Sequence, residues 1–424
     1  MTPPTRHRPS DAHGVVRLAT DATTGLTDLV EAMHVRIARP PGLSAQAADE
    51  RAGGISGLVY KSIRGVTRVV GGSIEALLGL LTPALSPGHK TPEREAIVAA
   101  LNGVLGDYLA ATGNPLATPM TLRVGGRPLE LERTALEARL PNAGGDVLVL
   151  VHGLCMNDLQ WSRTSDDRSH DHGAALARDH GFTPLYLHYN SGLHISINGQ
   201  TLAHLLQRLV DAWPQPLQRL MLLGHSMGGL LARSALHHGL QSGQRWPALL
   251  SDMVFLGTPH HGAPLERAGH WVDVVLGAAP YAAPFARLGK LRSAGITDLR
   301  HGNLLDEDWV GRNPSTRGAD YRQAVPLPES VRCFAAAACI GQRSSDLKSR
   351  LLGDGLVPLD SALGLHDDPL RALTFAKDRQ WVGYRMGHLD LLSRPEVFAQ
   401  LQQWLRPAAQ KRPRRKPGPA DVRA

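Results

Sequence analysis

The sequence predicts an α/β fold, with a mostly parallel sheet that carries helices on both faces. The chain has 424 residues, 42% of them hydrophobic, which is enough to build a large core. From Asp146 onward, short apolar runs alternate with stretches of helical period. The runs are apolar throughout and do not alternate with polar residues, which is typical of strands buried on both faces of a parallel sheet.

The strands are predicted one by one from these runs. Six segments have the length and composition of strands: 147–151, 184–187, 220–223, 253–256, 331–340 and 380–384. Helical period is found in 201–213, 230–238 and 395–405. Ahead of them, residues 115–140 hold alternating runs about a Gly125-Gly126 pair, which favours a hairpin.

The chain divides into four zones by composition. The composition predicts a disordered arm at residues 1–14 and a helical extension at 15–113. It predicts the α/β domain at 115–405 and a disordered basic tail at 406–424. Residues 264–326 lack a strong strand and contain scattered large apolar side chains. An insertion at this position is either a cap whose apolar inner face receives a ligand or a helical excursion without that role.

The charge of the chain is concentrated at its end. The net charge is +8, and the last 19 residues hold seven basic residues and one acid, while the first 14 contribute +1. The body therefore carries only about +1, so no nucleic-acid partner is expected. The tail is interpreted as a solvated segment, with binding to anionic lipid or to nucleic acid as the alternatives.

Cysteine content and apolar patterning suggest the compartment. Three cysteines cannot close a disulfide framework, no signal-peptide apolar region follows the N-terminus, and no uncharged apolar run reaches about 18 residues. These features predict a cytoplasmic location. Residues 53–81 form an amphipathic pattern whose other face carries Lys61, Arg64 and Arg68. Such a helix either packs on the main domain or makes peripheral contact with a membrane.

The strongest chemical signal is the pentapeptide Gly224-His225-Ser226-Met227-Gly228. It follows a predicted strand and precedes a predicted helix, which is the context in which G-x-S-x-G presents a nucleophilic serine. The glycines let the chain turn sharply, and the helix N-terminus behind the turn favours negative charge. Ser226 is therefore the candidate nucleophile, with a structural turn serine as the alternative.

A serine hydroxyl needs a base and an orienting acid further along the chain. His388 follows the last predicted strand, where a loop histidine can reach the serine; His237, His238 and His366 are less well placed. Asp354 lies between two glycines in a loop after the strand 331–340, and Asp360 is its competitor. The base and the orienting acid predicted for Ser226 are His388 and Asp354.

Two backbone N–H groups are expected to bind an oxyanion. The glycine of Val151-His152-Gly153-Leu154 lets the chain turn after the first strong strand, so the N–H of Leu154 can point at a reacting carbonyl. The N–H of Met227 supplies the second donor. Residues predicted to line the substrate pocket are His152, Gly153, His225 and His260, with the His152 ring in a structural hydrogen-bonding role.

These motifs, in this order, resemble an α/β-hydrolase. The resemblance is carried by His152-Gly153-Leu154, by residues 224–229, by Gly257-Thr258-Pro259-His260-His261-Gly262, by residues 354–358 and by His388-Leu389-Asp390. It spans about residues 145–405 and is greatest to bacterial class 2 triacylglycerol lipases and GPI inositol-deacylase-like hydrolases. It implies a serine carboxyl-ester hydrolase acting on a lipid or other acyl ester, with Ser226, Asp354 and His388 as the matching triad.

The resemblance also bears on metal ions. Asp390 matches a calcium-binding aspartate of those lipases, but at their second calcium position this chain has only Glu329 nearby. One ligand of several is not enough for Ca²⁺, so no metal and no cofactor are predicted. The N-terminal helical extension has no counterpart in those lipases.

Two alternatives remain open at the level of function. The same machinery serves thioesterases, amidases and acyltransferases, and the motifs do not separate them. A hydrolase fold can also act as a non-catalytic binding module, which would not need all five motifs.

Overall fold

The computed structural model describes residues 91–165, 168–263, 293–311, 320–342 and 351–406. Several predictions lie outside the described residues: the arm 1–14, the amphipathic segment 53–81, residues 264–292 and 312–319 of the predicted cap, and nearly all of the basic tail.

The centre of the molecule is an eight-stranded sheet with the order β10-β9-β8-β7-β3-β6-β1-β2. Six of its strands run parallel, and β1 pairs antiparallel with both β2 and β6 at one edge. The bounds are β1 Thr121–Val124, β2 Arg127–Pro128, β3 Asp146–Val151, β6 Thr183–His188, β7 Arg219–His225, β8 Leu250–Leu256, β9 Arg332–Cys339 and β10 Gln380–Tyr384. The predicted α/β fold class is confirmed.

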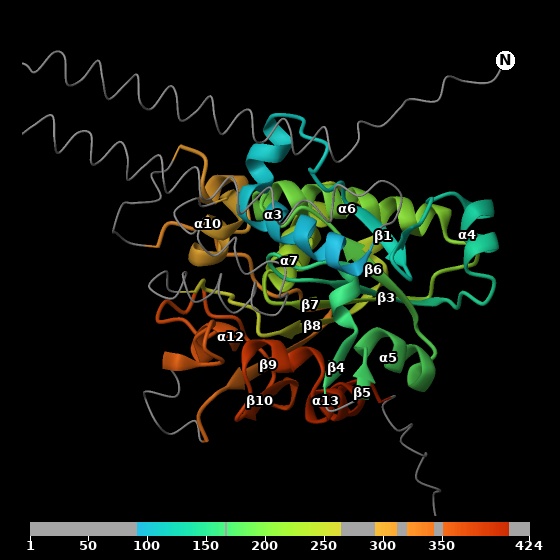
Figure 1. The fold of residues 1–424 in the computed structure, drawn as a ribbon. Helices are drawn as coiled ribbons and strands as arrows, with labels where there is room; N and C mark the ends of the chain where they lie inside the picture. Colours follow the sequence, from blue (N-terminus) through green and yellow to red (C-terminus); the bar gives the residue numbers. More distant parts are fainter. Residues whose placement is uncertain (1–90, 166–167, 264–292, 312–319, 343–350, 407–424) are drawn as a thin grey trace, which may run out of the picture.

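Helices cover both faces of this sheet, as Figure 1 shows, with α6 and α7 above it and α5 and α13 below it. The described helices are α3 Pro92–Ala111, α4 Arg133–Arg139, α5 His172–His180, α6 Ile195–Ala212, α7 Met227–Gln241, α8 Trp246–Leu249, α10 Ala294–His301, α12 Leu359–Ala362 and α13 Pro395–Leu405. Short 3₁₀ turns are η2 Asp158–Trp161, η5 Asp306–Asp308, η6 Lys377–Arg379 and η7 His388–Leu392.

Strand β3 explains why two layers of helices are needed. Side chains alternate between the faces of a strand, so Val147 and Val149 pack toward α6 and α7, while Leu148 and Leu150 pack toward α5 and α13. All four side chains are fully buried. A strand that is apolar on both faces must be covered on both, which is the physical content of the uninterrupted apolar run in the sequence.

The predicted strands all form, as does the hairpin. Gly125 and Gly126 have φ of 58° and 71°, the left-handed conformations that a two-residue turn between β1 and β2 requires. A second hairpin, β4 Arg163–Ser165 with β5 Arg168–His170, was not predicted. Its strands are three residues long and polar, so they carry no hydrophobic period that a sequence could display.

Helix α3 lies in the segment 15–113, which the sequence predicts as a helical extension ahead of the domain 115–405. Thr91 caps the helix by accepting from the N–H of Arg94, and Pro92 occupies its first turn. Its apolar side chains, including Ile97, Leu101 and Val104, share one core with the sheet. Helical period shows that a segment has an apolar face but not what that face contacts. The sequence alone therefore does not show that α3 packs on the sheet.

A buried ionic cluster fastens α3 to the sheet edge. Nη1 of Arg123 on β1 lies 2.9 Å from Oε2 of Glu95 on α3 and 3.1 Å from Oδ1 of Asp158 on η2. Nδ1 of His188, at the end of β6, lies 3.1 Å from the same Asp158 oxygen. Although burial opposes its ionisation, His188 and Arg123 hold the pKa of Asp158 below its usual value. The cluster joins four elements at one point.

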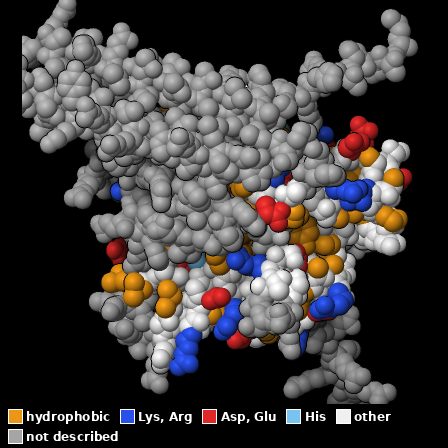
Figure 2. All heavy atoms as spheres, in the orientation of Figure 1, with side chains coloured by type: hydrophobic (Ala, Val, Ile, Leu, Met, Phe, Trp, Pro, Cys, Tyr) orange, Lys and Arg blue, Asp and Glu red, His pale blue; other side chains and the backbone are white. Residues whose placement is uncertain are grey.

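Among the described residues, no helix has the length and apolarity needed to cross a membrane. In the face that Figure 2 presents, acidic and basic side chains lie among one another over the described surface.

Candidate active site

Ser226 lies at a sharp turn between β7 and α7, at the carboxyl edge of the sheet. Its φ of 56° and ψ of −124° are outside the regions that non-glycine residues prefer, so the turn is strained. The strained turn is held by a hydrogen bond from the N–H of Ser226 to the carbonyl of Leu256 (2.8 Å) and by one from Gly229 to Ser226 (3.1 Å).

The glycines around Ser226 are required by close contacts. A Cβ on Gly224 would lie 2.6 Å from the Cα of Gly229, and one on Gly228 would lie 2.7 Å from the carbonyl oxygen of His152. Neither distance is compatible with a side chain. At positions 224 and 228 the backbone segments therefore approach so closely that only glycine fits.

Asp354 and His388 meet on the same edge of the sheet. The Nδ1 of His388 lies 2.6 Å from Oδ2 of Asp354, and both side chains are 1% exposed. The other carboxylate oxygen, Oδ1, accepts the N–H groups of Leu356 (2.9 Å) and Val357 (2.8 Å). This carboxylate is thus fixed by three hydrogen bonds. The competitor Asp360 lies on α12 instead.

The ring of His388 is positioned by the segment that holds Ser226. The rings of His225 and His388 are 4.7 Å apart, and Nε2 of His225 lies 3.3 Å from the carbonyl oxygen of His388. A Cβ on Gly257, whose φ is 59°, would lie 3.1 Å from Cε1 of His388. A strand-elbow-helix serine and a downstream Asp–His pair thus occupy one edge of a parallel sheet. The described residues adopt the α/β-hydrolase fold.

A known protein family matches part of the chain. Residues 142–313 match the family model described as PGAP1-like alpha/beta domain, which is less than half of the chain. None of the curated proteins matches the chain at a significant level.

Several of the similar solved structures are named as lipases or esterases. A Bacillus licheniformis lipase in its mature form is 17% identical with a TM-score of 0.38, over 68% of this chain and 97% of the lipase. A Pyrococcus furiosus esterase is 13% identical with a TM-score of 0.34, over 62% and 81%. An Aspergillus fumigatus lipase is 12% identical with a TM-score of 0.33, over 65% and 58%.

In the α/β-hydrolase domain, the turn after β3 lies directly against the candidate nucleophile. A Cβ on Gly153 would lie 3.1 Å from the Cβ of Ser226, so this turn and the elbow are in contact. Met227 is the first residue of α7, and its N–H is among those that an α-helix leaves without an intrahelical acceptor. The two predicted oxyanion donors, the N–H groups of Leu154 and Met227, belong to two segments that touch.

His152 supports the turn from behind. Its Nδ1 lies 2.8 Å from the carbonyl oxygen of Gly153, and its ring stacks on Tyr189 at 4.3 Å. Because C=O and N–H of one peptide point in opposite directions, holding the Gly153 carbonyl also fixes the direction of the Leu154 N–H. Burial lowers the pKa of His152 to about 3, so the ring is neutral and can donate from Nδ1 while it stays uncharged.

The other predicted pocket residues have contacts of their own. His225 contacts His388, and its burial, with the neighbouring His388, holds its pKa well below the usual value. His260 packs against Phe255 and Phe375, at 4.8 and 5.6 Å between ring centroids, and its Nδ1 lies 3.3 Å from Arg233. These contacts favour a positioning role for His225 and a core role for His260.

The described residues contain no group of three or more His, Cys, Asp or Glu arranged to hold a metal ion. Oδ2 of Asp390, the aspartate at the lipase calcium position, accepts the N–H of Gly387 at 2.7 Å. It thereby caps the turn that carries His388.

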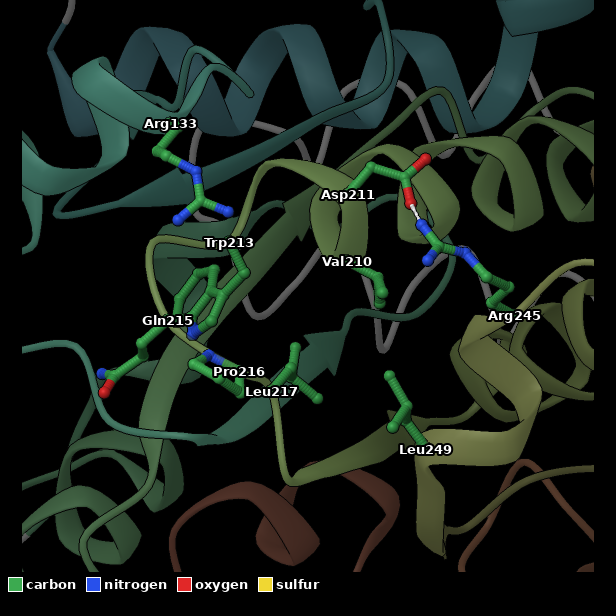
Figure 3. Close-up of a pocket in the computed structure, with 9 residues that line it drawn as sticks. All are labelled: Arg133, Val210, Asp211, Trp213, Gln215, Pro216, Leu217, Arg245 and Leu249. Atoms are coloured by element: carbon green, nitrogen blue, oxygen red, sulfur yellow. Dashed lines mark hydrogen bonds and ion pairs between the residues drawn. The ribbon is translucent and has the colours of Figure 1, made fainter.

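A hollow of about 440 Å³ lies at the opposite edge of the sheet, between the end of α6, the loop before β7 and the start of α8. Figure 3 shows Arg133 above it and the ion pair of Asp211 with Arg245 on its other side. The remaining residues around it are Val210, Trp213, Gln215, Pro216, Leu217 and Leu249. It lies beside the amino end of β7, whereas Ser226 follows the carboxyl end.

Sequence reasoning missed the supports of the turn after β3. Ser191 accepts the N–H of Cys155 at its Oγ (3.0 Å), and the hydroxyl of Tyr189 donates to the carbonyl of His152 (2.9 Å). Their position after β6, beside β3, was the available signal.

Buried neutral histidines predict a loss of stability in acid. Burial lowers the pKa of His152 to about 3 and of His172 to about 4, from about 6.5 in the unfolded chain. As the pH falls below 6.5, the unfolded chain binds these protons first, so stability decreases until the folded pKa values are reached. At pH 5 each histidine should cost about 2 kcal/mol.

Urea unfolding at pH 7.5 and pH 5.0 measures this loss. His172→Gln should reduce the difference between the two pH values by about 2 kcal/mol, because one titrating ring is gone. Equal unfolding free energies at the two pH values for the unaltered chain would contradict the prediction.

Proposed function

We propose that this protein is a serine hydrolase of carboxylic esters, with Ser226 as nucleophile, His388 as base and Asp354 as orienting acid. The observation that carries the proposal is the 2.6 Å contact between His388 and Asp354, buried on the same edge of the sheet as the strained Ser226 turn. A strained serine and a buried Asp–His pair each cost stability, and together they have a use in acyl transfer.

The first half-reaction forms an acyl-enzyme. Oγ of Ser226 attacks the ester carbonyl carbon while Nε2 of His388 takes its proton, and the carbonyl oxygen becomes an oxyanion. The N–H groups of Leu154 and Met227 donate to that oxyanion. When the tetrahedral intermediate collapses, His388 gives the proton to the departing alkoxide, and the alcohol leaves with the acyl group on Ser226.

The second half-reaction restores the enzyme. His388 takes a proton from water as the water oxygen attacks the acyl carbon, and the same two N–H groups hold the new oxyanion. Collapse breaks the bond to Oγ of Ser226, which recovers its proton from His388, and the carboxylic acid leaves. Asp354 accepts from Nδ1 of His388 throughout, which keeps Nε2 available as the acceptor.

The substrate class we propose is a lipid or other acyl ester. The support for it is the match of residues 142–313 to the PGAP1-like alpha/beta domain family, together with the large apolar side chains in the sequence of the segment 264–326. An apolar cap can bury an acyl chain, which contributes about 0.8 kcal/mol for each CH₂ group removed from water.

A fluorophosphonate probe tests the proposal directly. The probe phosphonylates only serines that a base activates, so we expect stoichiometric labelling that peptide mass spectrometry assigns to Ser226. Hydrolysis of p-nitrophenyl esters, acyl thioesters and anilides should then rank esters first. Labelling elsewhere, or folded protein that neither labels nor hydrolyses esters, would favour the binding-module alternative.

A further inference from the structure

Helix α3 contacts the turn after β3 at the point where the turn carries the candidate oxyanion donor. Gly103 faces Cys155, the residue after Leu154, and a Cβ on Gly103 would lie 2.9 Å from both the Cα and the N of Cys155. Those are backbone atoms, which cannot rotate away as a side-chain end can. Any side chain at position 103 would therefore displace the turn or the helix.

Cys155 itself has a conformation that needs support. Its φ is 58°, one of three positive values among the described non-glycine residues, and Ser226 is another. Such a conformation persists only where the surroundings determine it. Two contacts do so here, the backbone of α3 at Gly103 on one side and Oγ of Ser191, which accepts the N–H of Cys155, on the other.

The support continues into the loop that holds Ser191. Asn190 donates from Nδ2 to the carbonyl oxygen of Gly106 at 2.8 Å, and a Cβ on Gly192 would lie 2.7 Å from the N of Gly106. Helix α3 therefore packs, backbone against backbone, on the loop whose serine holds Cys155. The carbonyl of Gly103 in turn accepts the hydroxyl of Ser293 at 2.7 Å, just before α10.

We infer that α3 sets the geometry of the oxyanion hole, with Gly103 and Ser191 as positioning residues for the N–H of Leu154. This inference rests on the proposed function for its catalytic consequence. The peptide unit between Leu154 and Cys155 is joined to the one that carries the Leu154 N–H through the Cα of Leu154, so a shift of Cys155 changes φ and ψ of Leu154 and with them the direction of its N–H. Helix α3 thereby acts on the reaction through the turn after β3.

The test combines Gly103→Ala and Ser191→Ala with Ala110→Ser as a matched control on the exposed side of α3. Because the effect is on the oxyanion, we expect kcat for a p-nitrophenyl ester to fall about 10- to 100-fold in both variants, with KM within about threefold. The control should keep the parent kcat. Ser191→Ala removes one hydroxyl only, so it provides the answer if Gly103→Ala does not fold.

A readout independent of activity separates this inference from the proposed function. Hydrogen–deuterium exchange of peptides covering 151–158 should accelerate in Gly103→Ala and Ser191→Ala and stay unchanged in Ala110→Ser. Faster exchange in a protein that hydrolyses no ester would support the structural role of α3 and contradict the proposed function. Unchanged exchange, or an unchanged kcat with Ser226-dependent hydrolysis intact, would overturn the inference.

A double variant adds a further check. Cys155→Gly removes the Sγ that the new Cβ would meet and allows the positive φ without strain. Combined with Gly103→Ala, it should restore at least threefold of the lost kcat. No restoration would mean that the new Cβ acts through the backbone N and Cα of residue 155, which lie 2.9 Å from it and remain in Cys155→Gly.

Discussion

Ser226→Ala should lower kcat/KM for the best ester by about 10⁵- to 10⁶-fold, the loss found when the nucleophile of a serine triad is removed. In the proposed mechanism no other hydroxyl replaces Oγ, because the acyl group bonds to the serine of the strained turn, with His388 as its base. The residual rate should still exceed that in buffer, since the N–H groups of Leu154 and Met227 remain. Stopped-flow or steady-state hydrolysis of a p-nitrophenyl ester measures it.

The matched control is Ser242→Ala, at the exposed end of α7. It removes the same atom and should keep the parent rate. Alanine retains the Cβ of serine, so Ser226→Ala leaves the backbone strain in place and its melting temperature should stay within a few degrees of the parent. Full activity in Ser226→Ala would exclude this serine as the nucleophile.

Asp354→Asn should lower kcat by about 10³- to 10⁴-fold while KM changes little. The amide oxygen can still accept the N–H groups of Leu356 and Val357, so the loop keeps its shape. The amide nitrogen then faces Nδ1 of His388 and donates to it. That bond places the imidazole proton on Nε2, which can no longer take the proton of Ser226.

Asp360→Asn, six residues further along, is the control for this variant. It changes the same functional group on α12 and should retain activity within about twofold. Crystal or solution structures of Asp354→Asn should show an unaltered loop, so that the loss is one of tautomer and not of folding. If Asp360→Asn were the inactive variant, the acid would have been assigned to the wrong residue.

The strands and the elbow could be predicted because their causes are local. An uninterrupted apolar run indicates a strand buried on two faces, and glycine at 224 and 228 indicates a turn too tight for a Cβ. The Asp–His pair could be predicted as well, because the carboxyl ends of parallel strands converge on one edge and chain order narrows the choice. Contact between the two side chains needed the structure.

The role of α3 could not be predicted, because the contact that leaves no room for a side chain at Gly103 is with Cys155, 52 positions further along the chain. In the sequence, a glycine inside a helix is a cost to helix stability and nothing more. The same limit applies to Cys155. Its residue type indicates only a small buried side chain, and the sequence does not show that its φ is positive. Backbone contacts between distant parts of the chain produce no periodic pattern of apolar residues from which they could be predicted.

The position of α3 in the chain has a consequence for synthesis. Ser293, which donates to the carbonyl of Gly103, is synthesised 190 residues after it, and His388 is synthesised long after Ser226. At roughly 5–20 residues per second, about 10 to 40 s pass between the emergence of α3 and that of its last partner. Strands β3, β6, β7 and β8 emerge within that interval, so the sheet is available to the apolar face of α3 before the contact with Ser293 can form. The Asp354–His388 contact can form only after residue 388 has emerged, so the proposed site is completed near the end of synthesis.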